Sequence, residues 1–404
     1  MLFSRWLKCF VARLSGGLRP RRSSLRRGPL RAATSSQLTG SRLGRFATVP
    51  ERLEDRTLLA AVSWDNGAGD GLWQSAANWS GDVLPTSVDD VTIGSNFNVA
   101  LSSGTQSINS LTDTSSGSLV ISGGSLSIAA TSSISNTFTL SAGILTGTGT
   151  LSIAGQMTWT GGNMEGSGTT ITNGALAITG VNQNLDTRTL TINGGATLDG
   201  TTGLRGRNGA TINVNSLFDI QTDADLEHTA GAVAVLNNSA SGTLRKSAGA
   251  GQSFIGFEFN NLGVAEAQSG ELSIQRGGTS TGSFTAATSA TLSFAAFANM
   301  GGLINNLNAG SSVSGAGTIS FSGATTNIAG TFNPTGLTHV NGGTANFNSA
   351  ASTGTLLLSS GVLAGSNTLT VSGSSTWTGG NMEGSGATIT NGALAITGVN
   401  QNLD

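Results

Sequence analysis

The side chains of this 404-residue chain that could most readily do chemistry cluster in the stretch FDIQTDADLEHTAG. Carboxylates are the oxygen ligands that Ca²⁺ prefers, and paired carboxylates catalyse glycoside hydrolysis. In a strand of period 2, Asp223, Asp225 and Glu227 would share one face. We expect a solvated acidic edge here, with Ca²⁺ binding and acid–base catalysis as alternatives. The weak Ca²⁺ candidates are Asp219, Asp223, Asp225 and Glu227.

A second group of candidates consists of aromatic side chains. Trp64, Trp73 and Trp79 lie close together in VSWDNGAGDGLWQSAANWSGDVLPTSVDDVTIG. Their indoles could stack on sugar rings, which makes a glycan contact one interpretation. They could equally cover the end of a repetitive fold, because terminal repeats must differ from the rest and each indole can bury up to ~250 Å². We expect a cap over residues 63–104, with glycan contact as the alternative.

Other catalytic chemistry finds little support in the residues. The sequence has two histidines, His228 and His339, and one cysteine, Cys9. Neither histidine follows a G-x-S-x-G elbow, and a zinc site needs three or four ligands. We therefore predict no catalytic residue, no cofactor and no metal beyond the weak Ca²⁺ candidates.

The charge is divided unevenly along the chain. Residues 1–60 carry 12 Arg and one Lys against three acidic residues, whereas residues 61–404 carry six basic and 18 acidic residues. This asymmetry predicts a separate, disordered basic tail over residues 1–46. The acidic body argues against nucleic-acid binding, and no apolar run is long enough for a transmembrane helix. An Arg-rich, acid-poor start is also typical of organelle transit peptides, which remain an alternative.

A short motif follows the basic tail. The stretch ERLEDRTLLA resembles the LEPR-XLL motif near the N-termini of surface and secreted proteins of planctomycete bacteria. Asp55 stands where the motif has Pro. The resemblance implies a targeting segment over residues 47–62 and a secreted or cell-surface location. The matching residues are Leu53, Glu54, Arg56, Leu58 and Leu59.

From about residue 105, apolar residues alternate with Ser and Thr between clusters of Gly, Asn and Ser. Period-2 alternation predicts strands with one buried face, and the clusters predict turns. Irregular strand spacing argues against a propeller, and the scarcity of large aromatic residues argues against a sandwich. We expect an all-β, right-handed parallel β-helix. The clearest pairs are Leu119/Ile121, Leu126/Ile128, Leu151/Ile153, Leu176/Ile178, Leu190/Ile192 and Ile212/Val214.

The body also contains a copy of itself. The stretch WTGGNMEGSGTTITNGALAITGVNQNLD begins at Trp159 and recurs from Trp377, where the one difference is Ala387 in place of Thr169. At ~20–25 residues per coil, the offset of 218 residues corresponds to roughly nine to eleven coils. Because the second copy stops at Asp404, we expect a truncated C-terminal end to the repetitive region of residues 105–404.

The repeats resemble those of filamentous-haemagglutinin and autotransporter passenger β-helices. The units AEAQSGELSIQRGG and AGSSVSGAGTISFSG carry this likeness, and the Trp-rich opening is similar to the first segment of many autotransporter-like proteins. The resemblance implies a non-enzymatic, exported structural or adhesin-like protein whose partners are surface glycans or envelope proteins. A β-helix polysaccharide lyase or hydrolase and a carbohydrate-binding module are the alternatives.

Overall fold

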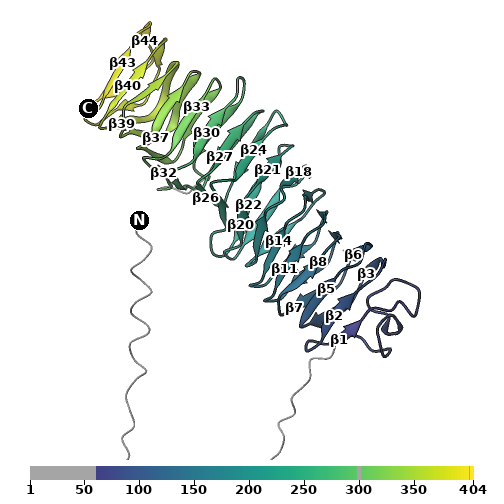
Figure 1. Ribbon diagram of the computed structural model, residues 1–404. Helices are drawn as coiled ribbons and strands as arrows, with labels where there is room; N and C mark the ends of the chain where they lie inside the picture. Colours follow the sequence, from purple (N-terminus) through teal and green to yellow (C-terminus); the bar gives the residue numbers. More distant parts are fainter. Residues whose placement is uncertain (1–60, 298–301, 400) are drawn as a thin grey trace, which may run out of the picture. The chain divides into compact units, whose positions relative to one another are not determined.

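The computed structural model describes residues 61–297, 302–399 and 401–404. The predictions for the basic tail, and for the targeting segment up to residue 60, therefore lie outside the described residues. The described chain consists of short parallel strands, from β1 (Ala61–Ser63) to β45 (Asn402–Leu403), and one 3-10 turn, η1 (Ala76–Asn78). Successive strands stack along one axis (Figure 1), which confirms the predicted all-β parallel β-helix.

Each coil contributes one strand to each of three faces. We call the face that contains β1 the first face, and the next two along the chain the second and third faces. Strands on the same face pair in parallel from coil to coil. Pairs from the early coils are β5 (Ser110–Asp113) with β8 (Ser132–Ile134) on the first face, β6 (Ser118–Ile121) with β9 (Thr137–Leu140) on the second, and β4 (Thr105–Ile108) with β7 (Ser125–Ile128) on the third.

The second face is a sheet of 15 strands, whereas the first and third faces join into one sheet of 30 strands. They join because β37 (Leu337–Phe347) and β39 (Thr355–Gly365) run without interruption around the corner between these faces. Coil length varies along the stack. Ile144 pairs with Asn163, 19 residues on, whereas Leu226 pairs with Ile255, 29 residues on.

The interior is filled by the inward positions of the alternating strands. Every apolar residue of the six predicted pairs, such as Leu190 and Ile192, is no more than 1% exposed. Burying each such side chain contributes roughly 1.5–3 kcal/mol. Later coils fill the same space with phenylalanines, whose ring centroids lie 5.3 Å apart for Phe284–Phe294 and 5.7 Å apart for Phe294–Phe321.

Close stacking of the corners requires small residues. Gly143 and Gly162 occupy the same corner in successive coils, with φ of +75° and +80°. A Cβ atom on Gly162 would lie 2.5 Å from the carbonyl oxygen of Gly143. Glycine meets both demands because it adopts positive φ readily and has no Cβ.

The two copies of the duplicated segment occupy different faces of the solenoid. In the first copy, β12 (Met157–Trp159) lies on the second face and β13 (Asn163–Met164) on the third. In the second copy, the matching strands β41 (Ser375–Trp377) and β42 (Asn381–Met382) lie on the third and first faces. The offset is therefore ten coils and one further face, which agrees with the predicted nine to eleven coils.

The local structure of the copies is nevertheless the same. The indole Nε1 of Trp159 donates to the carbonyl of Gly162 at 3.3 Å, and that of Trp377 donates to Gly380 at 3.1 Å. In both copies the Asn of the next strand donates to the Glu two residues later, at 2.8 and 2.9 Å. The local sequence therefore determines the strand and turn structure, whereas the position of a strand within its coil determines the face on which the strand lies.

The tryptophan-rich segment closes the N-terminal end of the described solenoid. The indole of Trp79 packs against Trp64 and Trp73, with ring centroids 4.8 and 4.7 Å apart, and its Nε1 donates to the Trp73 carbonyl at 2.7 Å. The Trp73 amide in turn donates to the carbonyl of Ala100 in β3 (Val99–Leu101), a strand of the first coil. Within residues 63–104, β2 (Asp90–Ile93) and β3 already pair with strands of the next coil.

One inward position carries a carboxyl group. Asp113 pairs with Ile93 and Ile134 in the neighbouring coils of the first face and is 2% exposed. One of its oxygens accepts the backbone N–H of Ser115 at 2.9 Å. Burial raises the pKa of Asp113 above its usual value, since the ionised form loses its hydration.

We expect Asp113→Asn to stabilise the protein at neutral pH. The amide oxygen can still accept from Ser115, while the charge is removed. Below the unfolded-state pKa of about 3.9 both variants are neutral at this position. As pH rises through the raised native pKa, the native wild-type protein holds its proton more tightly than the unfolded chain, so the wild type loses stability relative to the variant. Urea unfolding from pH 3 to 8 measures this difference, and a pH-independent difference would contradict the assignment.

Candidate functional site

The acidic cluster does not form one surface. Asp219 lies in β21 (Leu217–Ile220) on the second face, and Glu227 lies in β22 (Leu226–Ala230) on the third. Asp223 and Asp225 lie in the corner between these strands. The prediction that Asp223, Asp225 and Glu227 share one strand face is therefore wrong, because only Glu227 of the three lies in a strand.

Two of the carboxylates are paired with cations on the next coil. Both oxygens of Asp219 accept from the Arg245 guanidinium, at 3.2 and 3.1 Å. Burial alone would raise the pKa of Asp219, but the hydrogen bonds from Arg245 and Gln221 hold it below its usual value. Asp223 accepts from the Nζ of Lys246 at 2.8 Å, and this bond lowers the pKa of Asp223.

Lys246 is fully buried, and its other partners show a structural role. Its ammonium also donates to the carbonyls of Thr222 and Ala248, at 2.7 and 3.0 Å, and to the Ser253 hydroxyl at 3.1 Å. A buried cation must be paired and hydrogen-bonded in this way. The Lys246–Asp223 pair therefore ties together the wide corner of the 29-residue coil.

The remaining two carboxylates have separate partners. Asp225 accepts the backbone N–H of Phe254 at 2.8 Å, and burial raises its pKa. Glu227 lies 3.5 Å from the Arg205 guanidinium, in a pair that is partly exposed and contributes little to stability. Within the described part of the chain, no three His, Cys, Asp or Glu side chains converge as metal ligands do. The geometry supports four separate structural contacts rather than one Ca²⁺ site.

The two histidines are also engaged locally. The Nδ1 of His228 accepts the backbone N–H of Ala234 at 3.3 Å, and the Nε2 of His339 lies 2.8 Å from the Ser359 hydroxyl. Burial lowers the pKa of both imidazoles. Both histidines lie on the third face, His228 in β22 and His339 in β37, more than a hundred residues apart in the chain.

The three clustered tryptophans cannot serve as a sugar-stacking platform in this structure. Trp64 is 4% exposed, and Trp73 and Trp79 are fully buried. Stacking on a sugar requires an open ring face, and each ring here contacts another indole. The glycan-contact alternative for these residues is therefore wrong, because the cap uses them as its own core.

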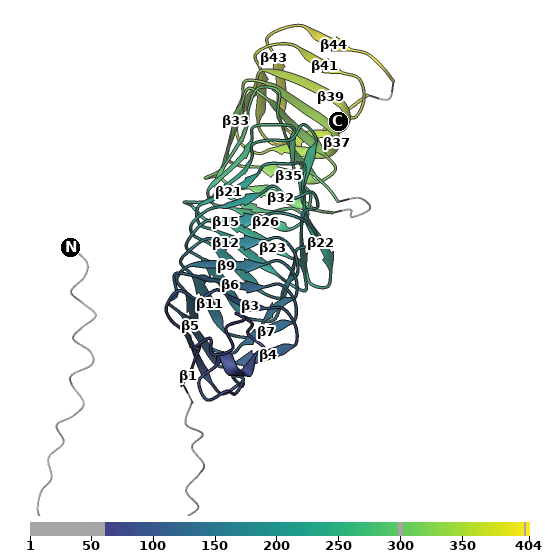
Figure 2. The same ribbon diagram turned by 90° about the vertical axis from the view of Figure 1, so that its right-hand side faces the viewer.

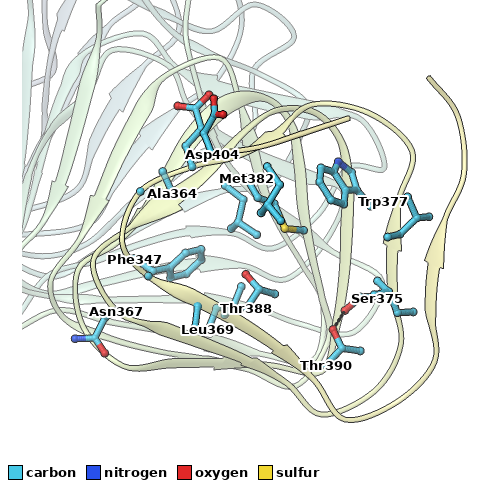
Figure 3. A pocket seen from close by; sticks show the side chains of 18 residues that line it. Phe347, Ala364, Asn367, Leu369, Ser375, Trp377, Met382, Thr388, Thr390 and Asp404 are labelled. Carbon is cyan, nitrogen blue, oxygen red and sulfur yellow. Dashed lines mark hydrogen bonds between the residues drawn. The ribbon is translucent and has the colours of Figure 1, made fainter. Parts of the chain in front are cut away.

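An open pocket of about 340 Å³ lies at the last described coils (Figure 3). Phe347, Leu369, Trp377 and Met382 project into the same space from different strands (Figure 3). These positions continue the inward rows that fill the interior elsewhere, as the parallel partner of Leu369, Ala351, does in the coil before. The pocket thus has the character of solenoid core, and we assign no ligand to it.

A row of asparagines, which was not predicted from the sequence, lies on the outside of the first face. The row has two runs, and we call them together the amide ladder. In each run, the asparagine of one strand lies in register with the asparagine of the paired strand in the next coil. The first run is Asn213, Asn237 and Asn260, and the second run is Asn306, Asn327 and Asn346.

The ladder amides bond to one another along the axis. Asn237 Nδ2 donates to Asn213 Oδ1 at 3.0 Å, and Asn260 Nδ2 donates to Asn237 Oδ1 at 3.2 Å. In the second run, the two corresponding bonds are 2.9 Å each, with Asn327 at the centre. A shallow groove of about 520 Å³ borders the first run. The signal in the sequence that could have indicated the ladder is the Asn that recurs as the third residue of strands such as TINV, VLNN and TTNI.

The two ends of the groove and its second wall come from neighbouring elements. Thr191 in β17 (Thr189–Ile192) and Thr279 in β29 (Gly278–Ser280) lie at its two ends, in register with the ladder. The second wall is formed by the corners that follow the ladder strands, which carry Ser239 and Leu262.

Comparison with known proteins gave no match among protein-family models, among curated proteins or among solved structures. The class of this protein therefore rests on its fold, a parallel β-solenoid of about 15 coils. In the described residues, no helix has the length and hydropathy needed to span a membrane.

Proposed function

We propose that the protein is a non-enzymatic, exported structural or adhesin-like component of a bacterial surface. The observation that carries this proposal is the continuous stack of coils, whose interior is filled by buried apolar side chains from Trp64 in the cap to Trp377. Figure 2 shows the stacked strands from a second direction. Their parallel pairing from coil to coil places side chains in regular rows along each face. A long solenoid whose coils contact mainly their neighbours is suited to displaying many weak contacts over an extended surface.

The charged side chains also favour a structural role. Arg245, Lys246 and Arg205 each pair with a carboxylate of the predicted acidic cluster. Arg188, which is fully buried, donates to the Thr170 hydroxyl at 2.8 Å and to the carbonyl of Glu165 at 3.1 Å. Burial lowers the pKa of Arg188 to about 10. These groups are used to hold corners together, which leaves them poorly placed for acid–base catalysis.

Export is proposed from the resemblance of residues 51–60 to the LEPR-XLL motif of planctomycete surface proteins. The cap and the repeat style, with their likeness to autotransporter and filamentous-haemagglutinin β-helices, support the same proposal. If the exported chain is released, the protein is secreted, and if it is retained, the protein lies on the cell surface.

The proposal is tested by locating the full chain in the bacterium that encodes it. We expect antibodies raised against residues 61–404 to label intact cells or the culture medium, and external protease to remove the label from cells. A label found only after the cells are opened would overturn export. The enzymatic alternative is tested with the same chain on pectin-like and alginate-like polymers. Sugar release that is lost in Asp223→Asn or Asp225→Asn would overturn the non-enzymatic assignment.

A further inference from the structure

The groove beside the first run of the amide ladder has the chemistry of a ligand site. Each asparagine amide has two N–H groups and an oxygen with two lone pairs. At Asn237, the ladder uses one N–H toward Asn213 and one lone pair toward Asn260. One donor and one acceptor therefore remain on the central rung, on a side chain that is only half buried.

The groove repeats this arrangement along the solenoid axis. Parallel strands are ~4.8 Å apart, so the five rungs from Thr191 to Thr279 span about 19 Å. The lining is uncharged throughout, and it consists of Thr, Asn and Ser with one leucine. That leucine, Leu262, is 56% exposed and supplies an apolar surface beside the amides.

We propose that this groove binds a neutral polysaccharide chain lying along the solenoid axis. A linear polymer of hydroxylated rings offers a donor and an acceptor at regular intervals, which matches the N–H and the lone pair that remain on each asparagine rung. The C–H face of a sugar ring would contact Leu262. This inference rests on the proposed function as a surface protein and names the class of ligand for it.

Other classes of ligand fit the groove less well. A protein partner would be expected to bury aromatic or aliphatic anchors in a central pocket, and the groove offers Leu262 as its one large apolar side chain. A nucleic acid or an acidic polysaccharide requires cations for its charges, and the lining residues carry none.

The chain provides a matched control for the test. Asn327 in the second run donates one ladder bond and accepts another, as Asn237 does in the first, but it does not line the groove. Substitution by Ala at either position therefore removes the same two amide–amide bonds. Only Asn237→Ala also removes ligand contacts, so the comparison separates binding from ladder stability.

The experiment is affinity electrophoresis of the full chain through gels containing neutral polymers, namely hydroxyethylcellulose, xylan, galactomannan and dextran. We expect at least one to retard the wild type, Asn237→Ala to raise the dissociation constant tenfold or more, and Asn327→Ala to leave it unchanged. Thermal unfolding of both variants checks that they lose similar stability. If Asn237→Ala does not fold, Leu262→Asp is the second variant and is also expected to weaken retardation.

Three outcomes would overturn the inference. They are retardation by none of the neutral polymers, retardation only by polygalacturonate or alginate, and equal weakening by Asn237→Ala and Asn327→Ala. Surface labelling of cells that express the wild-type chain keeps the two proposals apart. A labelled surface without neutral-polymer binding would contradict the groove assignment alone, whereas an unlabelled surface would contradict the proposed function.

Discussion

Leu176→Ala is expected to lower the free energy of unfolding by about 2–5 kcal/mol, the range for large-to-small substitutions in a packed core. Leu176 begins β15 (Leu176–Ile178), where it pairs between Met157 and Ala196 and is 1% exposed. Truncation of the leucine side chain leaves a cavity in the interior, because strands of the coils on both sides cover this position. Chemical unfolding followed by circular dichroism measures the change.

The internal duplication supplies the control for this prediction. Leu394 begins β44 (Leu394–Ile396) within the same local sequence, NGALAITG, but it is 56% exposed and pairs with a neighbour on one side, Ser375. We expect Leu394→Ala to change the free energy of unfolding by no more than about 0.5 kcal/mol, as for a typical surface site. An equal loss of unfolding free energy in the two variants would contradict this view. It would show that the local sequence, rather than the cover given by neighbouring coils, determines how much this leucine contributes to stability.

The second large effect is expected at the cap. Trp79→Ala should lower the free energy of unfolding by about 3–5 kcal/mol, because Trp79 is fully buried between Trp64 and Trp73. Loss of the indole would also expose the first coil beneath the cap. Thermal unfolding and the shift of tryptophan fluorescence toward that of solvated indole report the effect together.

Two further variants define what Trp79 contributes. Trp79→Phe keeps an aromatic ring but leaves the Trp73 carbonyl without its 2.7 Å donor, so we expect a smaller loss of about 1–3 kcal/mol. Val83→Ala, at a side chain that is 64% exposed in the same segment, should have almost no effect. A Trp79→Ala protein as stable as Val83→Ala would show that the tryptophans do not close the solenoid.

The strands of the body could be predicted because their signal is local. The alternation of Leu190 and Ile192 with threonines requires one buried face, whatever the strand pairs with. The tryptophan cluster likewise indicated a cap from composition alone. The acidic cluster was predicted less well, because the same period-2 rule was extended to Asp223 and Asp225, which lie in a corner that the rule does not describe.

The amide ladder depends on information that the sequence does not display directly. Asn237 and Asn260 lie 23 residues apart, whereas Asn327 and Asn346 lie 19 apart. Because coil length varies, a fixed period does not align these side chains, and only the backbone pairing of successive strands brings them together.

Within the described residues, and apart from the corner at Asp223 and Asp225, the sequence by itself determined which strand side chains point inward and where the chain turns. Both properties depend on a few adjacent residues, through the alternation of the strand and the freedom of glycine at positive φ. The duplicated segment shows this clearly, because Trp159 and Trp377 make the same contact with the glycine three residues on. The tertiary structure alone decided on which face each copy lies and what covers it. The face on which the second copy lies depends on the summed lengths of all the intervening coils. No local stretch of sequence contains that information.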